Sequence, residues 1–227
     1  MKDSPYPDAY VNHYQMNRIV RHRLRNLCFG MSMALERMQE QTASVLPQAS
    51  ENCALMLKEL DHLMNFTHRM DLLFSELPEP EEKKLVDILL RVREEFAEKH
   101  PYCDLELEGP QLDVVIASGN YLSIILGELL DNAAEAALEP NPRLTWSRPD
   151  QKILKFAVTN QTDAPLEVPL SPPQPFFTTR GRHDGLGLAI VQRLVNHSNA
   201  TLTINQNGDD QVCAEVHFPT REFVPEC

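Results

Sequence analysis

Apolar residues in the first third of the chain recur at alternating steps of four and three, which predicts two long helices. The first runs from about Pro7 to Leu46 without an internal proline. Its apolar positions form a heptad seam, which consists of Val20, Leu24, Leu27, Met31, Ala34 and Met38. After a break around Pro47, Ser50 can cap a second helix that continues to about Leu77. The seam of this second helix consists of Cys53, Leu57, Leu60, Met64, Thr67, Met70 and Phe74.

Two long helices joined by a short turn predict an antiparallel hairpin. The apolar stripes are wider than one hairpin can bury, so we expect two copies of the chain to pair into a four-helix bundle. The alternative is a monomeric hairpin that packs against the rest of the chain.

The composition changes at residues 77–82, where two prolines and an acidic run resist packing and indicate a linker. We therefore expect a helical domain over residues 1–78, a linker over 79–83 and a second domain over 84–227. In the second domain, helical and alternating patterns are mixed. Helices are expected over 84–99, 121–138 and 185–196, and strands over 104–108, 112–116, 143–147, 153–160, 200–205 and 212–218. The fold class is thus a helical hairpin followed by a two-layer α/β sandwich, whose last two strands form a hairpin.

The composition is that of a globular protein, with 42% hydrophobic and 24% charged residues. A net charge of -12 argues against non-specific nucleic-acid binding, although Arg18, Arg21, Arg23 and Arg25 form a local basic patch. No apolar run approaches the roughly 18 residues that span a bilayer, and no signal peptide is present, so we expect no membrane insertion. The five cysteines form no CxxC pair, which favours reduced thiols and a cytoplasmic location.

The first candidate for chemistry is the segment Glu-Leu-Leu-Asp-Asn-Ala-Ala-Glu-Ala, residues 128–136. Glu128 and Asn132 are one helical turn apart and share a face. The opposite face is apolar, with Leu122, Ile125, Leu129 and Ala133. A carboxylate and a carboxamide oxygen on one face suit a hard cation such as magnesium.

The second candidate is Phe-Phe-Thr-Thr-Arg, residues 176–180, followed by Asp-Gly-Leu-Gly-Leu-Ala-Ile-Val, residues 184–191. Gly185 and Gly187 stand where a loop enters a helix. Without side chains there, backbone N–H groups can approach a phosphate at the helix N-terminus. Arg180 is placed to add a charge-assisted contact to the same phosphate.

These two segments, in this order and about fifty residues apart, resemble the N box and the F and G2 boxes of the histidine-kinase ATPase superfamily. The superfamily includes sensor histidine kinases, type II topoisomerases, Hsp90 chaperones and mismatch-repair ATPases. The resemblance implies an ATP-binding catalytic domain with Asn132 as a magnesium ligand and Glu128 at the position of a base. It further implies a nucleotide contact set of Asn132, Asn160, Thr179, Arg180, Gly185, Leu186, Gly187 and Leu188.

One position departs from the family pattern. Its members usually carry Asp-x-Gly-x-Gly after the strand that here ends at Asn160, and the Asp accepts a hydrogen bond from the adenine amino group. Here Asn160 replaces the Asp, and no glycine occurs from Gln161 to Pro165. The side-chain oxygen of Asn160 can still accept a hydrogen bond, but weaker adenine binding is expected.

The third candidate is His22, which falls opposite the seam of the first helix and is therefore exposed. His-Arg-Leu-Arg-Asn, residues 22–26, is similar to the His-Arg-Val-Lys-Asn phosphoacceptor box of a subgroup of sensor histidine kinases. The resemblance implies that His22 is the phosphorylated residue. It also implies that Asn26, one turn later, orients the water that dephosphorylates the partner. Arg23 stands where many kinases have an acidic base, so the group that deprotonates His22 is not obvious.

We therefore expect a dimeric protein-histidine kinase of a two-component system. ATP with Mg²⁺ would phosphorylate His22, and the phosphoryl group would pass to an aspartate of a response-regulator receiver domain. The basic surface around His22 suits an acidic receiver pocket. Two alternatives remain open: a histidine phosphotransferase with a degenerate ATP site, and a non-catalytic ATP-sensing adaptor dimer.

Overall fold

The computed structural model describes residues 8–136, 141–162, 174–177, 184–207 and 210–220. The chain divides into two compact units, Met1–Leu77 and Pro78–Cys227. None of the helices in the described part of the chain is long and apolar enough to cross a membrane.

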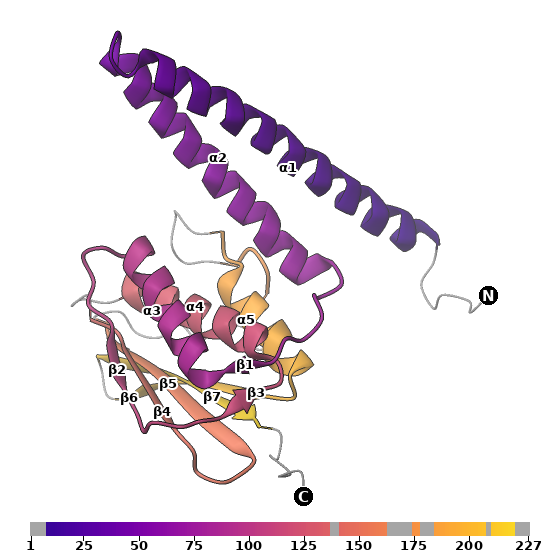
Figure 1. Cartoon of the computed structure of the whole chain (residues 1–227). Helices are drawn as coiled ribbons and strands as arrows, with labels where there is room; N and C mark the ends of the chain where they lie inside the picture. The colour runs from indigo at the N-terminus through magenta and orange to yellow at the C-terminus, as the bar shows by residue number, and fades with distance from the viewer. Residues whose placement is uncertain (1–7, 137–140, 163–173, 178–183, 208–209, 221–227) are drawn as a thin grey trace, which may run out of the picture. The chain divides into compact units, whose positions relative to one another are not determined.

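The first unit is an antiparallel hairpin of two helices, α1 (Asp8–Thr42) and α2 (Pro47–Phe74) (Figure 1). The second helix begins at Pro47 and not at Ser50. Proline suits this position because its ring holds φ at a helical value and its missing N–H would have no partner in the first turn. The predicted hairpin is thus present, with its second helix three residues longer at the start.

The two predicted seams behave differently. On α2 the seam residues Cys53, Leu60 and Thr67 are buried, as expected for a stripe that faces α1. On α1 the predicted apolar seam is exposed except for Leu24, which is partly buried, and Leu27 keeps 59% of its accessible area. The stripe of α1 that loses its exposure toward α2 lies further round the helix and consists of Arg21, Cys28, Ser32, Leu35 and Gln39.

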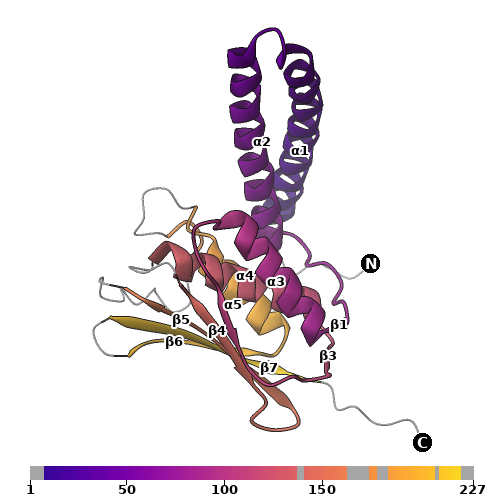
Figure 2. The same ribbon diagram turned by 60° about the vertical axis from the view of Figure 1, so that its left-hand side comes forward.

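The second unit has two layers, with three helices on one face of a five-stranded sheet (Figure 2). The strand order is β2-β4-β5-β7-β6. Its strands are β2 (Glu106–Glu108), β4 (Arg143–Ser147), β5 (Ile153–Gln161), β6 (Thr201–Asn207) and β7 (Gln211–Pro219). The β2–β4 pair is parallel and the other pairs are antiparallel. This mixed sheet covered by helices confirms the predicted fold class.

The core of the second unit is built around α4 (Gly119–Ala136), which packs against α3 (Leu85–Lys99), α5 (Gly187–His197) and β5. The α4 side chains Leu122, Leu126 and Leu129 are buried, as are Phe156 and Phe218 from the sheet. Burying each such side chain contributes about 1.5–3 kcal/mol. The helix that carries Glu128 and Asn132 is therefore firmly anchored.

The segment before α3 is held in place, which its proline-rich and acidic composition did not predict. Lys83–Lys84 form strand β1 and pair with β3 (Val115–Ile116), which was expected to be longer. Just upstream, the N-terminus of α4 holds the backbone of residues 78–81. Asn120 donates to the Glu79 carbonyl (3.0 Å), and Tyr121 donates to the Pro78 carbonyl. These partners lie some forty residues away along the chain, so local composition could not reveal them.

Candidate nucleotide-binding and phosphoacceptor sites

Glu128 and Asn132 lie one turn apart on α4, and both are partly buried. The opposite face of the helix is packed as the sequence indicates, because Leu122, Ile125 and Leu129 are at most 3% exposed. The side-chain Nδ2 of Asn132 is buried and has no hydrogen-bond partner among the described residues. A buried amide without a partner costs about 1–3 kcal/mol, which a ligand at this site would recover. This carboxamide therefore fits a polar ligand such as a metal-bound phosphate.

The N-terminus of α5 lies toward the end of α4 that carries Asn132. The rings of Tyr121, near the start of α4, and His197, at the end of α5, meet edge to face with centroids 5.6 Å apart. The two packed helices run in opposite directions (Figure 1). Eleven residues of α4 from Tyr121 to Asn132, and ten of α5 from His197 back to Gly187, each span about 15–17 Å. Asn132 and the first turn of α5 are thus at one level.

Gly185 is required by its backbone conformation. Its φ is +64°, and a Cβ atom would lie 2.7 Å from the backbone carbonyl carbon of Phe176 and from the carbonyl oxygen of Phe177. The amide of Phe176 also donates to the Gly185 carbonyl (2.9 Å). The first glycine therefore joins residues 176–177 to the loop, which is a packing role that the sequence did not indicate.

The remaining residues of this loop form the start of α5. Leu186 and Gly187 are buried, and Leu188 is partly buried. Gly187 is the first residue of the helix, so its N–H belongs to the free donors that attract anions. Thr179 and Arg180 lie outside the described residues.

Asn160, at the predicted adenine position, is buried near the end of β5. Its side-chain Nδ2 donates to the Gln161 carbonyl at 3.4 Å. This bond leaves the side-chain oxygen to accept a hydrogen bond, which is what an adenine amino group would need.

Asp131, which precedes Asn132, is a polar anchor that the sequence analysis did not single out. Its carboxylate accepts from Lys99 Nζ at 2.7 Å and lies 3.0 Å from His100 Nε2. Both partners stand at the end of α3, about thirty residues away. These contacts hold α4 against α3 at the residue directly before Asn132, the candidate magnesium ligand.

His22 lies on α1 with its side chain exposed, as predicted. Asn26, one turn later, brings its Nδ2 to 3.4 Å from His22 Nδ1. The assignment of oxygen and nitrogen in a carboxamide can be exchanged, so Asn26 can donate to a bare Nδ1 or accept from a protonated one. In the second case the lone pair of Nε2 is free to act as the nucleophile.

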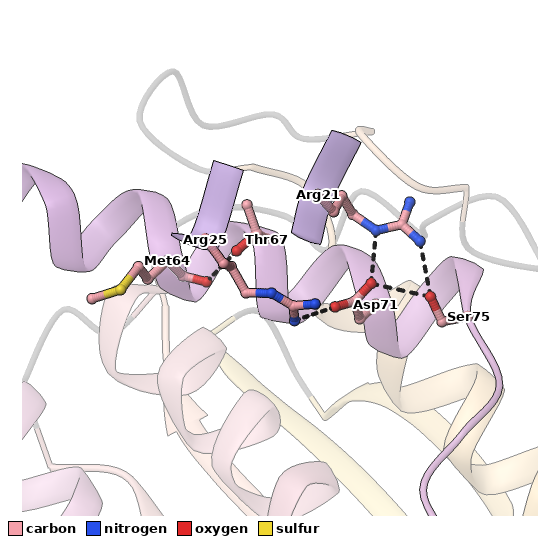
Figure 3. A network of polar contacts seen from close by, with 6 residues as sticks. All are labelled: Arg21, Arg25, Met64, Thr67, Asp71 and Ser75. Atoms are coloured by element: carbon pink, nitrogen blue, oxygen red, sulfur yellow. Dashed lines mark hydrogen bonds and ion pairs between the residues drawn. The ribbon is translucent and has the colours of Figure 1, made fainter. Parts of the chain in front are cut away.

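The predicted basic patch is partly neutralised, because two of its four arginines bind Asp71 on α2 (Figure 3). Arg21 is buried and donates from Nε to Asp71 at 2.7 Å and from a terminal nitrogen to Ser75 Oγ at 2.8 Å. Arg25 donates to the other carboxylate oxygen of Asp71. Arg18 and Arg23 stay exposed. The exposed positive charge near His22 is thus smaller than the sequence indicates.

The arginines also set the protonation of Asp71. Partial burial by itself raises the pKa of this carboxyl group, but hydrogen bonds from Arg21 and Ser75 and the charges of Arg25 and Arg21 outweigh it. The pKa of Asp71 therefore lies below its ordinary value. Its charged form is the one that the hairpin favours.

Within the described residues, no three His, Cys, Asp or Glu side chains come close enough together to hold a metal ion by themselves. A magnesium ion at Asn132 would therefore take most of its ligands from phosphate oxygens and water, which is how Mg²⁺ is usually bound beside nucleotides.

A helical hairpin with an exposed histidine, followed by a sandwich whose central helix carries Asn132, defines a histidine-kinase-like core. Residues 120–219 match the model of the GHKL domain family. The resemblance drawn from the sequence is thereby confirmed. No curated protein matches the chain.

Solved structures of histidine kinases have the same fold. Full-length ShkA in complex with AMPPNP matches 92% of this chain with a TM-score of 0.73 at 17% identity. The chain spans 46% of ShkA, about half its length. The histidine kinase AdeS of Acinetobacter baumannii matches 84% of this chain and 95% of its own, with a TM-score of 0.57 at 13% identity. The catalytic domain of histidine kinase ThkA matches 63% of this chain and 97% of its own, with a TM-score of 0.55 at 23% identity.

Proposed function

We propose that this protein is a protein-histidine kinase of a two-component system, which uses ATP and Mg²⁺ to phosphorylate His22. The observation that carries the proposal is the pairing, in one chain, of a GHKL domain with a helix that exposes His22 beside Asn26. A nucleotide site alone would fit many ATPases, and an exposed histidine alone would mean little. Together they supply a phosphoryl donor site and an acceptor.

The donor site uses the α4 face and the start of α5. The carboxamide of Asn132 would supply one oxygen ligand to magnesium, and the first N–H groups of α5 would bind phosphate oxygens. Thr179 and Arg180 would add contacts to the same phosphates, as the resemblance implies. Asn160 would accept a hydrogen bond from adenine, and Glu128 would act as a base or orient one.

The acceptor chemistry needs a neutral imidazole. His22 would form a P–N bond through one ring nitrogen while the bond between the γ-phosphorus and the bridging oxygen of ADP breaks. The ring proton would then be lost to Glu128 or to solvent. Asn26 would hold the ring through Nδ1, which leaves Nε2 to attack. The phosphoryl group would next pass to an aspartate of a receiver domain.

The exposed apolar residues of the hairpin support a dimer. On α1 the stripe with Val20, Leu27 and Met38 lies about a quarter turn from the stripe that faces α2. On α2 Met56 and Leu63, also exposed, lie about a quarter turn from the inner stripe in the same rotational sense. In antiparallel helices this places both stripes on one face of the hairpin. We propose that two copies join through this face into a four-helix bundle.

The side of α1 that carries His22 turns away from both of these stripes and suits a receiver domain. Phe29 and Met33 follow His22 two and three turns along the same side. Phe29 is 64% exposed and Met33 is 44% exposed. Together with the exposed Arg18 and Arg23, they offer apolar contact and positive charge to an acidic partner. We place this partner, and the kinase, in the cytoplasm.

Asn160 favours one alternative, a histidine phosphotransferase whose ATP site has degenerated. The buried Nδ2 of Asn132, which has no partner among the described residues, counts against it, because disuse should erode the phosphate and adenine ends together. An ATP-sensing adaptor dimer would keep the nucleotide site and lack phosphotransfer. Two measurements distinguish the three functions: the affinity for nucleotide, and the labelling of the protein by γ-labelled ATP.

The test combines calorimetric binding of an ATP analogue with incubation in γ-labelled ATP and Mg²⁺. Wild type, His22→Ala and Asn132→Ala are compared. The kinase predicts acid-labile label in wild type, none in either variant, and full nucleotide affinity in His22→Ala. Nucleotide binding without label would support the adaptor. No nucleotide binding, with label accepted from a phosphorylated receiver, would support the phosphotransferase.

A further inference from the structure

The polar network around Asp71 ties the two helices together directly beside His22. Arg21, the residue before His22, reaches Asp71 and Ser75 at the same time (Figure 3). Arg25 approaches the second oxygen of the same carboxylate from one turn further along α1. The carboxylate of Asp71 thus binds α1 through one arginine before His22 (Arg21) and one after it (Arg25).

Only an arginine can make the contact that Arg21 makes. Its guanidinium donates from Nε to Asp71 and from a terminal nitrogen to Ser75, and Ser75 Oγ in turn donates to Asp71 at 3.0 Å. A lysine would keep the charge but lacks the planar fork that spans two acceptors. The Arg21 and Asp71 side chains are 8% and 21% exposed, so water screens their interaction weakly.

Apolar packing from the described part of α1 is modest beside this network, where Leu24 is only partly buried. The inner stripe of α1 next carries Cys28 and Ser32, whose side chains are small, and Thr67 faces them from α2. The Thr67 hydroxyl donates to the Met64 carbonyl of its own helix. Small side chains interlock poorly, so directional hydrogen bonds are needed to set how α1 is turned.

We propose that Asp71 is a positioning residue for His22: through Arg21 and Arg25 it sets the rotation of α1 and thereby the direction in which the imidazole points. This proposal rests on the proposed kinase function, because the direction matters for meeting a phosphoryl donor. Asp71 touches neither substrate nor the reacting atoms. It acts through the two arginines that flank the histidine.

Ser75 extends the network to the end of α2. It is the C-cap of this helix, and its N–H donates to the Asp71 carbonyl at 2.9 Å.

The test measures the initial rate of autophosphorylation in the full chain, together with nucleotide affinity. Asp71→Asn and Arg21→Gln should each lower the rate at least tenfold and leave the affinity within twofold of wild type. Arg21→Lys should lower it nearly as much, since charge alone is insufficient, whereas Asp71→Glu should recover part of the rate. Asp61→Asn on α2 and Arg37→Gln on α1 remove the same charges at exposed positions and should have no effect.

Two further measurements distinguish positioning of His22 from a general role of Asp71 in the stability of the hairpin. Because the pair acts as a unit, the double variant Arg21→Gln/Asp71→Asn should be no slower than the worse single variant. Amide hydrogen exchange should rise in α1 around His22 in Asp71→Asn, while overall helix content by circular dichroism stays unchanged. Wild-type labelling rates in Asp71→Asn, additive losses in the double variant, or global loss of helix would each overturn the proposal.

A failure of the proposed kinase function would be distinguishable from a failure of the proposal for Asp71. If wild type takes no label from ATP, that function is refuted by the wild-type protein alone. Hydrogen exchange then decides the remaining claim, that Asp71 fixes α1 at His22. Unchanged exchange around His22 in Asp71→Asn would contradict it, and increased exchange confined to this stretch would uphold it.

Discussion

At the scale of single residues, the chemistry that we propose for His22 depends on its neighbours. Arg23, the residue after it, cannot serve as a base, and the polar atom that the structure brings to the ring is the Asn26 carboxamide, 3.4 Å from Nδ1. An oxygen there would hold a proton on Nδ1 and leave Nε2 free. We therefore propose that Asn26 also acts in the kinase direction, in addition to the role that the sequence implies.

Replacing Asn26 by Ala should lower the initial rate of autophosphorylation about fivefold, the equivalent of one hydrogen bond of about 1 kcal/mol. The rate is measured with labelled ATP at saturating nucleotide. Asn17→Ala, an exposed Asn on the same helix, is the matched control. A rate equal to wild type in Asn26→Ala would show that the ring needs no support from this side chain.

The ion pairs of Asp71 make hairpin stability depend on pH. The folded protein lowers the pKa of Asp71, so the charged carboxylate stabilises the fold at neutral pH, and this stabilisation disappears as pH falls through the lowered pKa. Asp71→Asn should therefore cost about 2 kcal/mol of unfolding free energy at pH 7. The difference from wild type should shrink toward zero in acid. Urea unfolding over a pH series checks this, and a pH-independent difference would contradict it.

At the scale of elements, the sequence predicted most of the second unit, because its patterns reflect burial. Strand β4 has the expected bounds, and β5 differs by one residue, because their alternation follows one buried face. The α1 stripe was misassigned for a related reason. The most apolar stripe of a helix need not face the helix that it packs against. In α1 the residues that face α2 include Arg21 and Cys28. The pairing of Asp71 with Arg21 depends on hairpin register, which no local pattern shows.

Gly185 offers a test of the loop before α5. Gly185→Ala would bring a Cβ to 2.7 Å from the backbone of residues 176–177 at a positive φ, which should cost about 1–3 kcal/mol of stability. Nucleotide affinity should fall at least tenfold because the start of α5 must shift. Gly127→Ala, on α4 with open space around it, should instead add about 0.8 kcal/mol. Thermal unfolding measures the stability of each variant, and calorimetry measures its nucleotide affinity. Equal stability and affinity in the two variants would refute the role of Gly185 in the loop before α5.

At the scale of the whole molecule, the exposed apolar face of the hairpin makes oligomeric state the decisive property. Leu27→Glu combined with Met38→Glu places two charges in the proposed dimer interface. The double variant should sediment as a monomer at concentrations where wild type is a dimer, because burying unpaired charges is costly. Val45→Glu, in the exposed turn, should stay dimeric. A monomeric wild type, or a dimeric double variant, would exclude this interface.

The proposed kinase must transfer a phosphoryl group from nucleotide to one residue, and mapping that residue tests this function most directly. Wild-type protein is incubated with ATP and Mg²⁺, digested at neutral pH to preserve acid-labile phosphoramidates, and the phosphorylated peptide is sequenced by mass spectrometry. We predict one modified peptide, with the phosphoryl group on His22 and none in Asn132→Ala. Phosphate on another residue, or no modified peptide despite measured nucleotide binding, would contradict the account.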